Sequence, residues 1–127
     1  IDIAVNNLVS LLLDHFNTKE NIDRAVTLAK RFKGSEQPYF VDSYGWALIN
    51  SGKNEEALQL LRDVVKKMPD VPVFRYHLGM AYRKTNSKAL AITELEEALK
   101  LGEKAGGFVE KEAVEKLLKT IKADSPA

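Results

Sequence analysis

The sequence predicts an all-α protein built from repeated pairs of helices. Two observations carry this prediction. A pattern centred on glycine recurs after 34 residues, so that Gly45 is followed by Gly79 and Ala57 by Ala91. Apolar residues recur at helical spacing, and no segment has the pattern of a strand. A period of 34 residues is typical of a repeat in which two helices are joined by a turn.

The two clearest copies of the repeat span residues 37–70 and 71–104. Each places a glycine in the middle of its first helix, where Gly costs about 1 kcal/mol relative to Ala. Close approach of the paired helix would justify this cost, because it needs small residues at Gly45 and Ala57. The same holds for Gly79 and Ala91. Larger side chains at these positions would push the helices apart.

Turn residues and prolines divide the chain at matching places. The segments 51–54 (Ser-Gly-Lys-Asn) and 85–87 (Thr-Asn-Ser) fall between paired helices and supply turn and N-cap chemistry. Pro38, Pro69 and Pro72 fall between repeats. Proline is tolerated in the first turn of a helix but not in its interior, so these residues mark boundaries.

A more degenerate copy is expected over residues 1–36, with helices over 6–12 and 25–32 and a long turn near His15. At the other end, residues 103–107 are expected to form a loop. A last helix is expected within 107–122, starting at Phe108. Its apolar residues share one face and its charged residues the other, which is the pattern of a capping helix at the end of a repeat array.

The repeat closely resembles the tetratricopeptide repeat, whose pattern is W-x2-L-G-x2-Y, then A-x3-F, then P. The residues that carry the resemblance are Tyr44, Gly45, Leu48, Ala57, Leu61 and Pro69 in one copy, and Leu78, Gly79, Tyr82, Ala91 and Leu95 in the next, which lacks the closing Pro. The length of the chain and the absence of a linker-like stretch predict a single domain over residues 1–127. The repeats predict a right-handed superhelix of three antiparallel helix pairs, followed by the capping helix.

A looser resemblance extends over most of the chain. The runs 6–12, 39–46 and 75–82 are similar to the C-terminal repeats of large bacterial tetratricopeptide proteins. Some of those proteins belong to the exosortase-linked PEP-CTERM system, which accompanies exopolysaccharide export. The resemblance implies a bacterial parent protein that is periplasmic or associated with the outer membrane. Without it, the sequence leaves the localisation open.

The first helix is apolar on more than one side, which indicates neighbours on both sides. Its apolar residues are Ile3, Val5, Leu8, Val9, Leu11, Leu12 and Leu13. The helical pattern is already under way at Ile1, so we expect the chain to be the C-terminal part of a longer repeat protein. We also expect an exposed apolar patch on this helix, through which copies could form a homo-oligomer.

Composition and motifs exclude several functions. Nineteen basic and eighteen acidic residues are spread without a basic block, which argues against binding to nucleic acid or anionic lipid. No apolar run is long enough to insert into a membrane, and cysteine is absent. His15 and His77 lie far apart, and the glycines of 102–107 lack a P-loop ending. We therefore expect no enzyme activity, no cofactor and no metal, and a packing or groove-facing role for His77.

The resemblance places a partner-binding groove on the first helix of each pair. The residues expected to line it are Asn6, Asn7, Ser10 and Asp14 in the first copy; Tyr39, Asp42, Ser43, Trp46, Ile49 and Asn50 in the second; and Val73, Tyr76, His77, Met80, Arg83 and Lys84 in the third. The expected function is a non-catalytic scaffold that presents this concave groove to a peptide or helix of a partner protein. The Lys, Arg and Asn clamp that holds a terminal carboxylate in chaperone adaptors is not reproduced.

Trp46 has two interpretations. It could contact a partner from the groove, where aromatic residues dominate binding energy, or pack near Tyr76 or Met80 of the next repeat. Two further functions stay open: a structural cap of a longer solenoid that mediates homotypic assembly, and, as the weakest, polysaccharide binding. Exposure of Trp46, Tyr39 and Tyr76 would favour partner binding over a purely structural cap.

Overall fold

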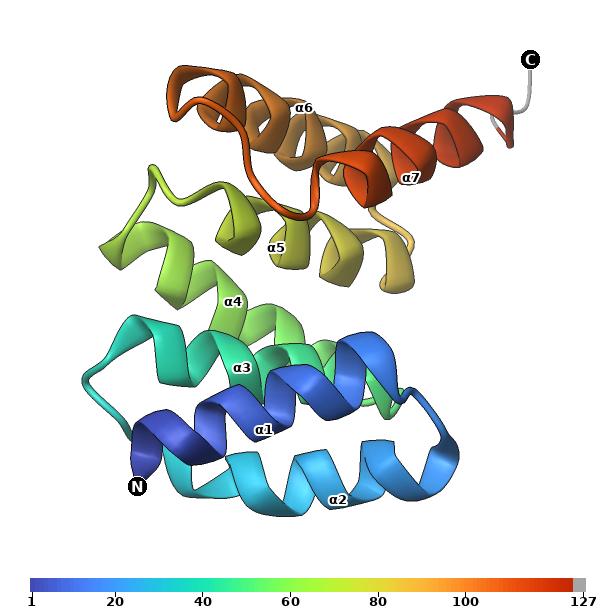
Figure 1. The fold of residues 1–127 in the computed structure, drawn as a ribbon. Coiled ribbons are helices and arrows are strands. Elements are labelled where there is room, and N and C mark those ends of the chain that lie inside the picture. The colour runs from blue at the N-terminus through green and yellow to red at the C-terminus, as the bar shows by residue number, and fades with distance from the viewer. Residues whose placement is uncertain (125–127) are drawn as a thin grey trace.

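The computed structural model describes residues 1–124, and those residues form helices joined by short turns (Figure 1). No strand occurs in this range, which confirms the all-α prediction. The helices are α1 (Asp2–His15), α2 (Lys19–Ala29), the short 3-10 helix η1 (Lys30–Phe32), α3 (Pro38–Asn50), α4 (Asn54–Lys67), α5 (Pro72–Lys84), α6 (Lys88–Lys104) and α7 (Lys111–Ala123).

The helices stack as three pairs, α1–α2, α3–α4 and α5–α6, with α7 packed on α6 (Figure 1). The first helices of the pairs also touch one another, since α3 contacts both α1 and α5. These three helices, α1, α3 and α5, therefore form one continuous layer.

Close helix packing explains the mid-helix glycines. A Cβ atom on Gly45 would lie 2.8 Å from Cδ2 of Leu61, and one on Gly79 would lie 2.8 Å from Cδ2 of Leu95. Leu61 and Leu95 are fully buried, so neither can move aside into solvent. The expected close approach is present, and the residue that makes the contact is the leucine four positions after the repeat alanine.

The turns inside the second and third pairs adopt the same conformation. Gly52 has φ +87° and Asn86 has φ +64°, and these left-handed residues lie one repeat period apart. Pro38 and Pro72 begin α3 and α5, as their fixed φ favours. The repeat is therefore visible in backbone conformation as well as in packing.

Several expected boundaries were wrong in the outer segments. His15 is the last residue of α1 rather than part of a turn, and α2 begins at Lys19 rather than near residue 25. The α6 helix continues to Lys104, and α7 begins at Lys111 instead of Phe108. The ring of Phe108 packs directly on Gly102 of α6, in the space that a Cβ there would occupy.

The core is divided along the stack. One cluster of buried side chains extends from α1 to α5, and a second joins α6 to α7. Met80 and Tyr82 are packed against both clusters and connect them. The last helix buries one apolar face, as expected for a cap, through Val114, Leu117, Leu118 and Ile121.

The first helix leaves part of its apolar surface uncovered. Ile3 is 72% exposed and Leu11 is 45% exposed, while Val9, Leu12 and Leu13 are buried. The expected apolar patch on α1 is therefore present. None of the helices between residues 1 and 124 has the length and the apolar run that crossing a membrane requires.

Candidate partner-binding groove

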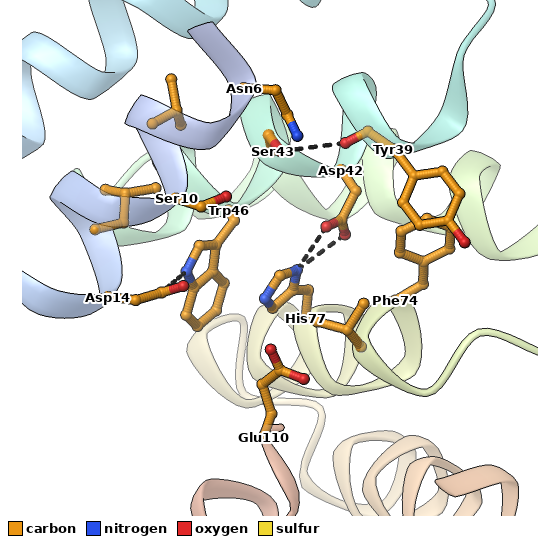
Figure 2. A pocket seen from close by; sticks show the side chains of 13 residues that line it. Asn6, Ser10, Asp14, Tyr39, Asp42, Ser43, Trp46, Phe74, His77 and Glu110 are labelled. Carbon is orange, nitrogen blue, oxygen red and sulfur yellow. Dashed lines mark hydrogen bonds and ion pairs between the residues drawn. The ribbon is translucent and has the colours of Figure 1, made fainter. Parts of the chain in front are cut away.

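A pocket lies where α1, α3 and α5 meet the segment that precedes α7 (Figure 2). Its volume is about 180 Å³, and its lining residues are Asn6, Val9, Ser10, Leu13, Asp14, Tyr39, Asp42, Ser43, Trp46, Val73, Phe74, His77 and Glu110. Nine of these residues were expected in the groove from the sequence. We call this cavity the acidic pocket, because its charged residues other than His77 are the carboxylates Asp14, Asp42 and Glu110.

His77 and Asp42 form a buried pair between α5 and α3. Nδ1 of His77 lies 2.9 Å from both carboxylate oxygens of Asp42, and the two residues are only 7% and 5% exposed. A carboxylate only accepts hydrogen bonds, so Nδ1 is the donor. The sequence placed both residues in the groove but did not indicate that they bind each other.

Trp46 covers this pair from the side. Its ring stacks on His77 with a centroid separation of 4.0 Å and lies 5.4 Å from the ring of Tyr76. Its indole Nε1 donates to Oδ1 of Asp14 at 3.1 Å (Figure 2). Trp46 packs against the next repeat, as one interpretation expected, and it is half-buried, so part of its surface still faces the groove. Contact with a partner stays a prediction.

A second depression adjoins the acidic pocket on the other side of Trp46. It has a volume of about 240 Å³, and its lining residues, all expected in the groove, are Trp46, Ile49, Asn50, Met80, Arg83 and Lys84. Its charged residues are basic, so we call it the basic pocket. The two pockets share Trp46, and together they are called the inner groove below.

Some expected groove residues have their polar groups engaged within the protein. Ser43 is buried, and its hydroxyl donates to the carbonyl of Tyr39 at 3.2 Å. The amide of Asn50 donates to the carbonyl of Trp46 and accepts from Asn17. Asn17 had no signal in the repeat pattern, because it lies in the turn after α1. These contacts tie the end of α3 to the turn after α1.

The remaining residues expected in the groove differ in how exposed they are. Asn7 is exposed but lines neither pocket, and Ile49 is buried. Tyr39 is 45% exposed, and its ring packs on Phe74 at a centroid distance of 4.9 Å. Tyr76 is half-buried beside Trp46. The three aromatic residues that distinguish a groove from a closed packing surface are therefore not all buried.

Negative charge gathers at the acidic pocket. Burial is the main cause that raises the pKa of Tyr76 above its ordinary value, and the charges of Asp14 and Glu110 raise it further. Glu110 was missed by the sequence analysis, since it lies outside the repeats in the segment before α7. Within residues 1–124, no three His, Cys, Asp or Glu side chains are grouped so that they could hold a metal ion.

Residues 74–104 match the family model of the tetratricopeptide repeat. This range covers nearly all of α5 and α6. A search of curated proteins finds no match to the sequence.

Solved structures share the fold over nearly the full chain. The type III secretion translocator chaperone SycD of Yersinia enterocolitica, in an alternative dimer, is 18% identical with a TM-score of 0.69, covering 95% of this chain and 93% of its own. PcrH in complex with the chaperone binding region of PopD is 16% identical, with a TM-score of 0.68 and coverage of 97% and 94%. PcrH from Pseudomonas aeruginosa is 15% identical, with a TM-score of 0.67 and coverage of 94% and 92%.

At these low sequence identities, the structural similarity shows a shared fold and does not show a shared role. The repeat motif, the packing at its glycines and the match of the third helix pair agree with one another. The chain has the fold of a tetratricopeptide repeat solenoid, and residues 74–104 match the family model of that repeat.

Proposed function

We propose that this chain is a non-catalytic protein-binding module that holds a peptide or helix of a partner protein in the inner groove. The observation that carries the proposal is the position of Trp46, which forms the shared wall of two adjoining pockets and is only half-buried. Aromatic residues in such positions supply much of the binding energy in protein interfaces. A purely structural cap has no need to leave this surface open.

Two further observations support the proposal. Tyr39 is exposed at the rim of the acidic pocket, so the aromatic surface continues beyond Trp46. In addition, PcrH, which has a similar fold, was solved in complex with the chaperone binding region of PopD. A parent protein that is periplasmic or associated with the outer membrane, in an exopolysaccharide-export assembly, is suggested by the looser sequence resemblance and stays a prediction.

Replacement of Trp46 by alanine is expected to weaken partner binding about tenfold or more. The chain is immobilised and used to select peptides from a random displayed library, and the affinities of the selected peptides are measured for native, Trp46→Ala and Tyr76→Ala chains. Phe16→Ala is the matched control, because Phe16 is an exposed aromatic residue outside the groove. Circular dichroism confirms that each variant is folded. Unchanged affinity in both groove variants would contradict the proposal.

A second candidate function, homotypic assembly, is favoured by the apolar surface of α1. Ile3, Asn7 and Leu11 follow one another at four-residue spacing and are all exposed, so they form one strip along the helix. We expect a second copy of the chain to cover this strip. Ile3, Asn7 and Leu11 line neither pocket of the inner groove, so variants in the strip test assembly separately from groove binding.

The double variant Ile3→Ser and Leu11→Ser is expected to shift the chain toward monomer, because it removes the exposed apolar surface that self-association would bury. Sedimentation velocity over a concentration series measures the shift as a change in the weight-average sedimentation coefficient. Leu90→Ser is the control, since Leu90 is 50% exposed on α6. A native chain that is monomeric at all concentrations would exclude this candidate.

A further inference from the structure

We propose that the acidic pocket binds the cationic side chain of a lysine or arginine carried by the partner segment. The inference rests on the proposed function, because it names the chemistry of the partner at one position in the inner groove. It is drawn from the charges that line the pocket, from one ring nitrogen of His77 and from the aromatic wall.

The pocket collects carboxylates from three separate elements. Asp14 comes from α1, Asp42 from α3 and Glu110 from the segment before α7, and no Lys or Arg is among the lining residues. Asp14 and Asp42 each hold one donor, the indole of Trp46 and the imidazole of His77. A carboxylate can accept more than one hydrogen bond, so both keep capacity for a ligand. Figure 2 shows the Glu110 carboxylate directed toward His77.

His77 adds an acceptor that faces the pocket from a mostly buried side chain. Its side chain is 9% exposed, and the bond from Nδ1 to Asp42 fixes the orientation of the ring. Because Nδ1 carries a hydrogen, Nε2 is an acceptor when the imidazole is neutral. Within residues 1–124 Nε2 has no hydrogen-bond partner, and it lies on the side of the pocket that Glu110 approaches (Figure 2).

An ammonium or guanidinium group matches this set of acceptors. Both groups carry several donors and no acceptor, so they can satisfy Nε2 of His77 and a carboxylate at the same time. An anionic side chain would meet negative charge on three sides. An apolar side chain would displace the water around Nε2 and the carboxylates. Because it offers no hydrogen bonds in place of those made by water, its binding would be unfavourable.

The walls of the pocket suit the rest of such a side chain. Trp46 and Tyr39 lie on opposite sides of the opening (Figure 2). The methylene groups of Lys or Arg pack well on apolar and aromatic surface while the charged head reaches acceptors. A cation near the face of Trp is additionally favoured by the charge distribution of the ring.

The test uses Trp46 as its reporter, because it is the only tryptophan in the sequence and it stacks on His77. Peptides are selected from a random displayed library on the native chain, synthesised, and titrated while the tryptophan fluorescence is recorded. The affinities are compared between native, Glu110→Gln and Glu112→Gln chains. Glu112 is the control, since it carries the same charge two residues away, is exposed and lines neither pocket.

We expect the selected peptides to share a Lys or Arg and to bind Glu110→Gln about fivefold more weakly, with less than about twofold change for Glu112→Gln. Replacing the shared basic residue by norleucine should weaken binding to the native chain and abolish the difference between the variants. Peptides that depend on Trp46 but share no basic residue, and bind Glu110→Gln normally, would overturn this inference and leave the proposed function intact. Failure to select any peptide would overturn both.

Discussion

Replacement of His77 by alanine is expected to lower the free energy of unfolding by about 3–5 kcal/mol. The Asp42 carboxylate is 5% exposed, and its hydrogen-bond partner within residues 1–124 is the His77 ring. Without that ring, a buried charge would lose its partner. The variant would also lose the ring on which Trp46 stacks. Urea denaturation at pH 7, followed by circular dichroism, measures the loss.

A double-mutant cycle separates the pair from simple loss of packing. Asp42→Ala alone leaves Nδ1 of His77 without its acceptor, at a cost of about 1–3 kcal/mol. The double variant His77→Ala and Asp42→Ala leaves no orphaned group, so it should be more stable than the sum of the two single effects indicates. Additive effects, or a loss below about 1 kcal/mol for His77→Ala, would show that the pair does not hold α3 against α5.

The repeat core could be predicted from the sequence because the residue types that its packing requires recur every 34 residues. Gly45 and Gly79 lie under equivalent leucines, and Gly52 and Asn86 adopt equivalent left-handed turns. Each feature is local to one helix pair and recurs with the period. The outer segments lack this recurrence. Phe108, for example, was assigned to the last helix, whereas its ring fills the space above Gly102.

The candidate site was only partly predictable, because its key contacts join different repeats. Asp42 and His77 are 35 residues apart, one more than the period, and their repeat equivalents are Tyr76 and Ser43. No periodic comparison can therefore pair them. Glu110 reaches the pocket from outside the repeats. The sequence could place side chains on the inner helices, but burial of Ser43 and the support of Asn50 by Asn17 depend on the assembled stack.

The second large effect concerns the mid-helix glycines. One substitution, Gly79→Ala, is expected to destabilise the native chain and to stabilise the Leu95→Ala chain. Leu95→Ala should cost about 2–5 kcal/mol, because Leu95 is fully buried and its loss leaves a cavity. In the native chain, Gly79→Ala alone is expected to lower the free energy of unfolding by about 1 kcal/mol, because overpacking against Leu95 outweighs the higher helix propensity of Ala. The new methyl group would also lie 3.3 Å from the carbonyl oxygen of Ala91.

In the Leu95→Ala background, the same Gly79→Ala substitution is expected to stabilise the chain by up to about 1 kcal/mol, because the obstructing leucine is gone and the propensity gain remains. Denaturant titration of the four chains of the cycle measures this reversal. Gly45 and Leu61 provide a replicate one repeat away, with the same 2.8 Å approach. If Gly79→Ala had an equal effect in both backgrounds, contact with Leu95 would not be the reason for glycine at this position. The packing account of the repeat would then have to be abandoned for both copies.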